Sequence, residues 1–424
     1  MTQTSKRRLT AEMPEFARAE LPNGVRVVTE SIPSVRSVSV GVWIYAGSRD
    51  EPVRLNGISH LIEHMVFKGT KRRRTHHIAQ RLESVGGYLN AFTAKEYTCF
   101  YARALDEHLE RAIETVCDLV LSPSFPDKEL TKEKEVVLEE MKMYEDAPED
   151  LIFDQFESVA YHGHPLSRPV IGTPRTVLRI GRNDLVEFVE RHYTPNRVVI
   201  AVAGNAAHEQ VTDLVQKSFE TSRRGRKPVR RKRVAEYVPN ERVVERPITQ
   251  AHLILGLRAL GANDPGRAAL VVLNTILGGG MSSRLNQNIR EKYGYCYQIY
   301  SFLNFHSDSG DFGVYMGTDS ERVDRARTLI LREFDRLRQN PVSARTLSSA
   351  KSQVKGSVML GLEGMSNRMM RLGRQELYYQ KYFSLDQVLD EIDSVTAEDV
   401  LSVARQLFAP DMFTTVSLLP AGSS

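Results

Sequence analysis

The sequence predicts an α+β protein built from two similar halves, each a mostly antiparallel sheet packed with helices. Two observations support this fold class. Apolar residues recur with both strand and helix periods, and the second half repeats the order of elements seen in the first. The length of 424 residues also exceeds one ordinary core and suits two domains of roughly 200 residues each.

The N-terminal half opens with strand signals and continues with helix signals. The turn LPNG at 21–24 precedes a β-branched run over 25–29, as in a hairpin. Residues 37–45, SVSVGVWIY, alternate like a strand. Helical periodicity predicts two helices next, over about 58–67 and 78–85.

Three further elements complete this half. A strand pair is predicted through NAFTAKEYTCFYARAL at 90–105. A long helix is predicted from Asp127 to Glu145, and the apolar run VVIAV at 198–202 is typical of a buried strand.

A basic segment separates the halves. RRGRKPVRRKR at 223–233 has eight basic residues in eleven, contains Gly and Pro, and has no apolar periodicity. We interpret it as a solvated linker, with binding of phosphates or an anionic surface as the alternative. The predicted boundaries are a first domain at 1–222, a linker at 223–236 and a second domain at 237–424.

The second half repeats the first. A strand at 252–260 leads through a polar turn to a helix at 268–277, and two strands follow within 301–317. A long helix then begins near Thr346. This order indicates an ancient duplication. The second copy lacks the histidines and paired glutamates described below, so we expect the chemistry in the first domain.

Composition excludes several classes of protein. The formal net charge is only +4, which gives no overall drive toward nucleic acid. Three cysteines without a CxxC pair argue against a disulfide framework. No apolar run is long enough for a membrane span or a secretory signal. We therefore expect a cytoplasmic protein with no nucleic-acid or membrane partner.

The motif HLIEH at 60–64 carries the chemistry. On a helix, His60, Glu63 and His64 share one face, while the residues between them can enter the core. Two imidazoles four residues apart fit adjacent corners of a zinc tetrahedron, and a neighbouring carboxylate can reach a water on the metal. Two incidental histidines on a helix are the plainer alternative.

A catalytic zinc also needs a third protein ligand and an open position. The helix at 127–145 offers four candidates, Glu133, Glu135, Glu139 and Glu140. Glu133 and Glu140 are seven residues apart and lie on one face, near the apolar residues Val136, Val137 and Met141. Glu139 points about 100° away from Glu140 and is expected to be solvated.

These motifs resemble the pitrilysin/insulinase metallopeptidases, in which the zinc motif is inverted, and their half-length processing-peptidase-like members. The resemblance covers nearly the whole chain. It rests on the following segments: HLIEHMVFKGT (60–70), GGYLNAFTAKEYT (86–98), EKEVVLEEMKMYEDAPED (133–150), HPLSRPVIGT (164–173), VAGN (202–205) and LGGGMSSRLNQNIREKYGYCY (277–297). It implies the two-domain fold of processing peptidases.

The resemblance also implies roles. His60, His64 and Glu140 would bind one Zn²⁺ per chain, Glu63 would be the catalytic base, and Glu133 would support the site. The family's substrate-clamping pair falls on Arg290 and Tyr297, whose alternative role is to fold a Gly-rich loop. Because that pair comes from the opposite half of a clamshell, a half-length chain is expected to form a homodimer whose sites are completed in trans.

The implied substrate is a peptide or an unfolded segment, bound as an added strand along Asn90, Ala91 and Phe92. For Asn90 the alternative is ordinary turn chemistry after Gly86-Gly87. Three functions stay open from the sequence. The protein is an active zinc endopeptidase, a processing-peptidase subunit that cuts presequences with a partner chain, or a non-catalytic scaffold.

Overall fold

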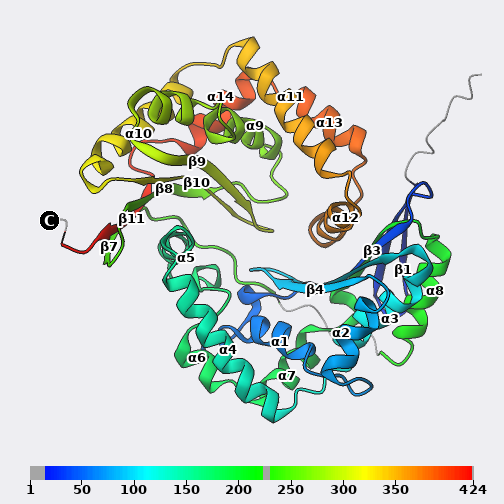
Figure 1. Ribbon diagram of the computed structural model, residues 1–424. Helices are drawn as coiled ribbons and strands as arrows, with labels where there is room; N and C mark the ends of the chain where they lie inside the picture. The colour runs from blue at the N-terminus through cyan, green and yellow to red at the C-terminus, as the bar shows by residue number, and fades with distance from the viewer. Residues whose placement is uncertain (1–14, 223–229, 423–424) are drawn as a thin grey trace, which may run out of the picture.

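The computed structural model describes residues 15–222 and 230–422. Two sheets with their helices form two halves, which face each other across the centre of the molecule in Figure 1. This arrangement confirms the predicted α+β class with two similar halves.

Six strands form the first sheet, in the order β1-β2-β6-β3-β5-β4. Their bounds are β1 Glu15–Glu20, β2 Arg26–Ser31, β3 Ser37–Ile44, β4 Tyr88–Thr93, β5 Thr98–Leu105 and β6 Val198–Gly204. Only the pairing of β2 with β6 is parallel. Strand β4 lies at the edge and pairs on one side only, with β5.

Five strands form the second sheet, in the order β7-β11-β8-β10-β9. Their bounds are β7 Glu241–Arg246, β8 Ala251–Ala259, β9 Cys296–Phe305, β10 Gly310–Thr318 and β11 Thr414–Pro420. Only the first and last strands of this half, β7 and β11, pair in parallel. The second sheet therefore has the topology of β2 to β6, and β1 is an addition to the first.

Helices cover both sheets. In the first half they are α1 Ile58–Val66, α2 Thr75–Glu83, α3 Leu109–Leu121, α4 Asp127–Glu145, α5 Pro148–Ala160, α6 Pro174–Arg179, α7 Arg182–His192 and α8 His208–Ser218. In the second half they are α9 Arg267–Gly278, α10 Val323–Gln339, α11 Ala344–Gly361, α12 Met365–Tyr379, α13 Leu385–Ser394 and α14 Ala397–Leu407. The long helix has the predicted bounds, whereas α2 begins three residues before its predicted start.

The halves exchange one helix each. Helix α5 packs on the second sheet, where Phe156 joins a buried cluster with Ile254 of β8. Helix α12 packs on the first sheet, where Leu372 joins a cluster with Trp43 of β3. Gly373 permits this approach, because a Cβ there would lie 2.2 Å from the Trp43 ring. Each sheet lies within one predicted domain, and the boundaries 1–222 and 237–424 stay a prediction.

The basic segment departs from its predicted solvated state at Arg231. Residues 223–229 of that segment lie outside the described part of the chain, and residues 230–236 have no regular secondary structure. The Arg231 side chain is only 11% exposed and forms ion pairs with Asp50 and Glu96, each at 2.8 Å. A solvated linker is wrong for this residue, because two buried carboxylates hold it.

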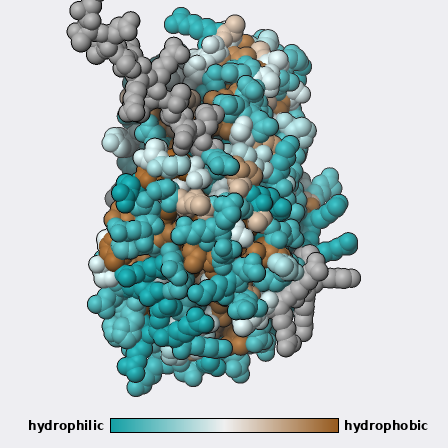
Figure 2. Space-filling model, turned by 90° about the vertical axis from the view of Figure 1, so that its right-hand side faces the viewer, coloured by the Kyte–Doolittle hydropathy of each residue, from teal (hydrophilic) through white to brown (hydrophobic). Residues whose placement is uncertain are grey.

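Figure 2 shows a face on which hydrophilic residues predominate and apolar residues occur in small groups. None of the helices in the described residues is long and apolar enough to cross a membrane.

Candidate metal centre

Helix α1 is fixed at its N-terminus by a buried carboxylate. Gly57 precedes the helix with a φ of 93°, a left-handed conformation that glycine adopts without strain. The Glu51 side chain accepts hydrogen bonds from the backbone N–H groups of Gly57, at 2.8 Å, and Ser59, at 2.9 Å. These N–H groups have no partner within the helix, so Glu51 satisfies them and sets the position of the next turn.

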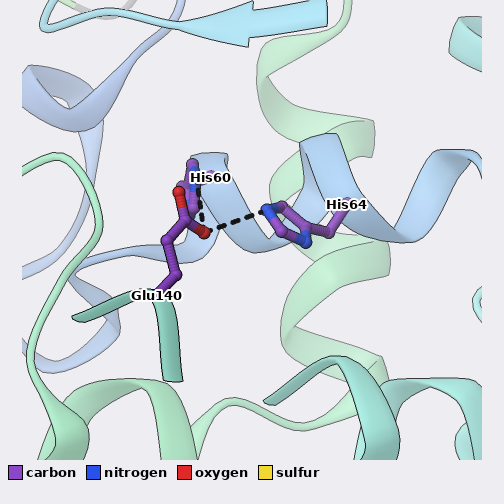
Figure 3. A group of neighbouring side chains, drawn as sticks. All are labelled: His60, His64 and Glu140. Atoms are coloured by element: carbon purple, nitrogen blue, oxygen red, sulfur yellow. Dashed lines mark ion pairs between the residues drawn. The ribbon is translucent and has the colours of Figure 1, made fainter. Parts of the chain in front are cut away.

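The predicted ligand residues meet between α1 and α4. One carboxylate oxygen of Glu140, Oε2, lies 3.8 Å from Nε2 of His60 and 3.5 Å from Nε2 of His64. Figure 3 shows this oxygen between the two imidazoles, with both histidines on one helix and Glu140 reaching across from the other. Leu61, Ile62 and Met65 face the core and are fully buried, as predicted.

Glu133 lies on the far side of the His64 ring. Nδ1 of His64 donates to Oε2 of Glu133 at 3.2 Å, and Nζ of Lys68 lies 2.7 Å from the other carboxylate oxygen. A histidine held through Nδ1 presents Nε2 to a metal in a fixed orientation. Glu133 therefore orients His64 rather than joining the group of ligand atoms.

The electrostatics of the group favour neutral histidine at His60. Burial, and then the neighbouring His64, lower the pKa of His60 to about 4. Burial also acts to lower the pKa of His64, but its hydrogen bonds with Glu140 and Glu133 outweigh that effect and raise it. The hydrogen bond with His64 is the main cause of the lowered pKa of Glu140.

Glu63 lies on the same helix face and has a separate partner. Oγ1 of Thr93, the last residue of β4, donates to Oε2 of Glu63 at 2.6 Å. Burial raises the pKa of Glu63 above its ordinary value. A carboxylate with a raised pKa accepts a proton more readily near neutral pH, which suits a general base.

The predicted substrate segment lies on β4, the edge strand beside α1. Asn90 is exposed and Ala91 is buried. The Phe92 ring packs with Trp43 and Tyr97, in the cluster under α12 and on the face of the sheet away from Ala91. Phe92 can therefore serve an added strand only through its main chain.

The structure does not bring the predicted clamp to the metal ligands of the same chain. Arg290 lies in the π-helical turn Asn286–Glu291, and Tyr297 is the second residue of β9 in the opposite half (Figure 1). Their side chains face each other, with the guanidinium carbon 5.9 Å from the ring centroid. Tyr297 is 83% exposed, so the described chain leaves it free to contact another molecule.

Around the candidate site, sequence reasoning misplaced one residue and missed three. Val136 was expected on the packed side of α4 but is 47% exposed, because the buried stripe runs through Val137 and Met141. Thr93, Lys68 and Glu51 were not singled out. Lys68 follows His64 by one helical turn, which is a usable signal, whereas the contacts of Thr93 and Glu51 depend on the fold.

The donor set fits a divalent zinc-like ion. One atom from each of His60, His64 and Glu140 can be chosen so that all lie within 4.8 Å of one another. Two imidazoles and a carboxylate are established zinc ligands. Nδ1 of His60 is buried and, within the described residues, has no hydrogen-bond partner. An ion beside the Glu140 oxygen would bind His60 through Nε2, on the other side of the ring from Nδ1.

Among the described residues, the first half holds this donor set and the second half holds no such group. Two histidines and a glutamate are the ligand type of the His₂Glu class of zinc peptidases. Residues 26–174 match the family model "Insulinase (Peptidase family M16)", and residues 179–354 match "Peptidase M16 inactive domain". The chain belongs to peptidase family M16, the insulinase family, as a half-length member. This confirms the resemblance seen in the sequence.

Bacterial relatives match along nearly their whole length. The chain is 40% identical to "Uncharacterized zinc protease YmxG" of Bacillus subtilis, over 95% of this chain and 97% of the relative. It is 42% identical to an uncharacterized zinc protease of Mycobacterium tuberculosis strain H37Rv, over 92% and 90% of the two chains.

Solved structures share the fold at low sequence identity. A Pseudomonas fluorescens protein described as a peptidase M16 inactive domain has a TM-score of 0.90 at 22% identity, covering 96% of this chain and 98% of its own. A protease from Helicobacter pylori has a TM-score of 0.89 at 22% identity, covering 96% and 100%.

Proposed function

We propose that the protein is a zinc-dependent endopeptidase that hydrolyses peptides or unfolded segments. The observation that carries this proposal is that one carboxylate oxygen of Glu140 lies between the imidazoles of His60 and His64. Glu63 lies on the same face of the helix as the two histidines. The names of the relatives support zinc and proteolysis as the class of chemistry.

His60, His64 and Glu140 would hold one Zn²⁺ per chain. Bound there, zinc would supply Lewis-acid activation of a water molecule and of the scissile carbonyl. Glu133 and Lys68 keep the His64 ring oriented through the hydrogen bond at Nδ1.

Glu63 moves the protons. Its carboxylate accepts a proton from the attacking water and passes it to the nitrogen of the leaving amine. Burial, which raises the pKa of Glu63, favours this exchange, and Thr93 holds one of its carboxylate oxygens in place.

Arg290 and Tyr297 would act on the partner's site. As the scissile carbonyl oxygen gains negative charge, the guanidinium and phenol groups donate hydrogen bonds to it. The exposed position of Tyr297, away from its own metal ligands, supports a homodimer in which each chain completes the other's site.

Substrate would bind along the free edge of β4. Asn90, Ala91 and Phe92 offer main-chain groups there, and an extended peptide can add as a further strand. Main-chain pairing gives affinity without strict sequence recognition, while enclosure between the halves favours peptides and unfolded segments over folded proteins.

A cleavage assay of the wild type beside Glu63→Gln tests the proposal. The variant is expected to keep its zinc and to lose about 10³-fold or more in kcat, the scale of a missing general base. Zinc content measured on both proteins is the control. Equal turnover by the two proteins would refute the mechanism.

The activity and zinc measurements also distinguish two other functions. A processing subunit that needs a different partner chain would be inactive when expressed alone and active once that partner is added. A scaffold would carry far less than one zinc per chain when purified without chelator. The three cysteines, all buried and free, support the accompanying proposal of a cytoplasmic location.

A further inference from the structure

A large cavity lies between the two halves and is lined by residues of both. Its volume is about 780 Å³, within the range of ligand-binding sites. The cavity is lined by the turn after β4, the end of β9, the end of α11 and one face of α12. In Figure 1, α12 lies between the halves, and it packs against β3 and β6 of the first sheet.

Helix α12 has two faces with different tasks. Met369, Leu372 and Leu377 are buried against the first sheet. On the other side, Arg371, Arg374 and neighbouring polar residues line the cavity. The two arginines are three residues apart, so their guanidinium groups project from one face of the helix.

Most other charges in the cavity wall are neutralised within the protein. Lys95 pairs with Glu157 at 2.6 Å, and Arg267 pairs with Glu391 at 3.1 Å. Glu96 is held at 2.8 Å both by Arg49 and by Arg231 of the linker. These pairs leave no carboxylate in the wall free to balance further positive charge.

Arg371 and Arg374 have no carboxylate partner in the described residues. Arg371 donates from Nη2 to the backbone oxygen of Phe383, and its guanidinium carbon lies 5.5 Å from the ring centroid of Tyr382. Arg374 donates from Nε to the backbone oxygen of Met370 at 3.3 Å. Guanidinium groups bind carboxylates with paired hydrogen bonds, so two such groups on one wall form a complementary surface for a carboxylate.

The cavity wall begins one residue beyond the end of β4. Ala94 in its wall directly follows Thr93, which holds Glu63. A peptide added along β4 and extended past Thr93 would enter the cavity within a few residues of the scissile bond, since each extended residue spans about 3.3 Å.

We propose that Arg371 and Arg374 form a subsite that selects substrates carrying a carboxylate a few residues from the cleaved bond. The carboxylate comes from an Asp or Glu side chain or from the C-terminus of the peptide. This proposal rests on the proposed function and adds a preference for acidic substrates to it.

The test measures peptide binding, so that it does not depend on turnover. Glu63→Gln protein is titrated with fluorescent peptides of one fixed sequence, in which Glu replaces Gln at each position in turn. Every peptide is made with a free C-terminal acid and with an amide. The same titrations use Glu63→Gln combined with Arg371→Gln and Arg374→Gln.

A preference of roughly 10-fold for the acidic peptide is expected at one or two positions, or for the free acid over the amide. The double arginine variant is expected to lose it while binding the neutral amide peptide as before. Tighter binding of a peptide with Glu at one position would identify a side chain as the source of the carboxylate. Tighter binding of the free acid than of the amide would identify the C-terminus.

Arg325→Gln on α10 is the matched control, because Arg325 is exposed and lies outside the cavity. Arg374→Gln alone removes only one hydrogen bond to the backbone, so this variant can be tested if the double variant folds poorly.

Three results would overturn the subsite. They are equal binding of acidic and neutral peptides, a preference that survives both arginine changes, and no binding by any peptide. Peptide binding without cleavage by the wild type would instead count against the proposed function alone.

Discussion

His64 and Glu133 are joined by a hydrogen bond of 3.2 Å between Nδ1 and Oε2. The contact links α1 to α4 from the side opposite Glu140, and Lys68 holds the other oxygen of the same carboxylate. His64 is thus fixed on one ring nitrogen and free to bind on the other. Histidine ligands in metal sites commonly have such a partner.

Glu133→Ala is expected to weaken zinc binding by roughly 10- to 100-fold, because His64 loses the group that orients its ring. The measurement is competition for zinc against a chelator of known affinity. Glu139→Ala is the matched control, since that side chain is on the same helix and 69% exposed. Equal zinc affinity in the two variants would contradict the orienting role of Glu133.

Thr93→Val is expected to lower kcat roughly 10-fold with little change in KM, because a charged hydrogen bond that places Glu63 is lost while the side chain keeps its shape. Steady-state kinetics and zinc content are measured together. Thr93→Ser keeps the hydroxyl and should recover most of the activity. If Thr93→Val turns over like the wild type, Glu63 does not depend on this contact.

Local patterns predicted α1 and α4 closely, because helix periodicity and the spacing of HLIEH are properties of a short segment. They could not show which sheet a helix covers. The apolar stripe of α12 packs against Trp43, more than 300 residues away in the sequence. The sequence alone does not reveal that α5 and α12 exchange halves.

In the candidate site, too, local spacing predicted some features, and others depend on tertiary structure. The helix spacing predicted that His60, Glu63 and His64 share a face, and the resemblance selected Glu140 from four glutamates. The contact from Thr93 depends on where β4 ends beside α1, and Arg231 is buried by carboxylates from two distant turns. Such contacts follow from tertiary structure and leave no periodic signal in the chain.

Mixing Glu63→Gln with Arg290→Ala is expected to restore activity that neither variant has alone. In a mixed dimer, the Arg290→Ala chain keeps an intact Glu63 and receives Arg290 from its partner. Random pairing would give roughly a quarter of wild-type activity, since half the dimers are mixed and each has one competent site. The measurement is peptide cleavage after the mixed chains have exchanged, with each variant alone as the control. No recovery would show that the sites do not cross chains.

The stability of the zinc-free protein is expected to fall in acid because of His192, at the end of α7. This side chain is 2% exposed, and Nη1 of Arg197 donates to its Nδ1 at 2.5 Å. Burial, and then the charge of Arg197, lower the pKa of His192 to about 4. Asp50 acts to raise this pKa, but it forms an ion pair with Arg197 at 3.2 Å.

The unfolded chain has a histidine pKa of about 6.5 and therefore binds the proton more readily than the folded chain between pH 6.5 and 4. The stabilisation is complete above pH 6.5 and is lost as the pH falls through this window. The loss between pH 7.5 and 4.5 is roughly 2 to 3 kcal/mol in the free energy of unfolding.

His192→Asn removes the titrating group while offering an oxygen to Arg197, so its unfolding free energy should vary less with pH by that amount. Urea unfolding of chelator-treated protein across the pH range measures the difference, and His76→Asn, at an exposed position on α2, is the control. Parallel pH profiles for the wild type and His192→Asn would assign the acid sensitivity to other groups.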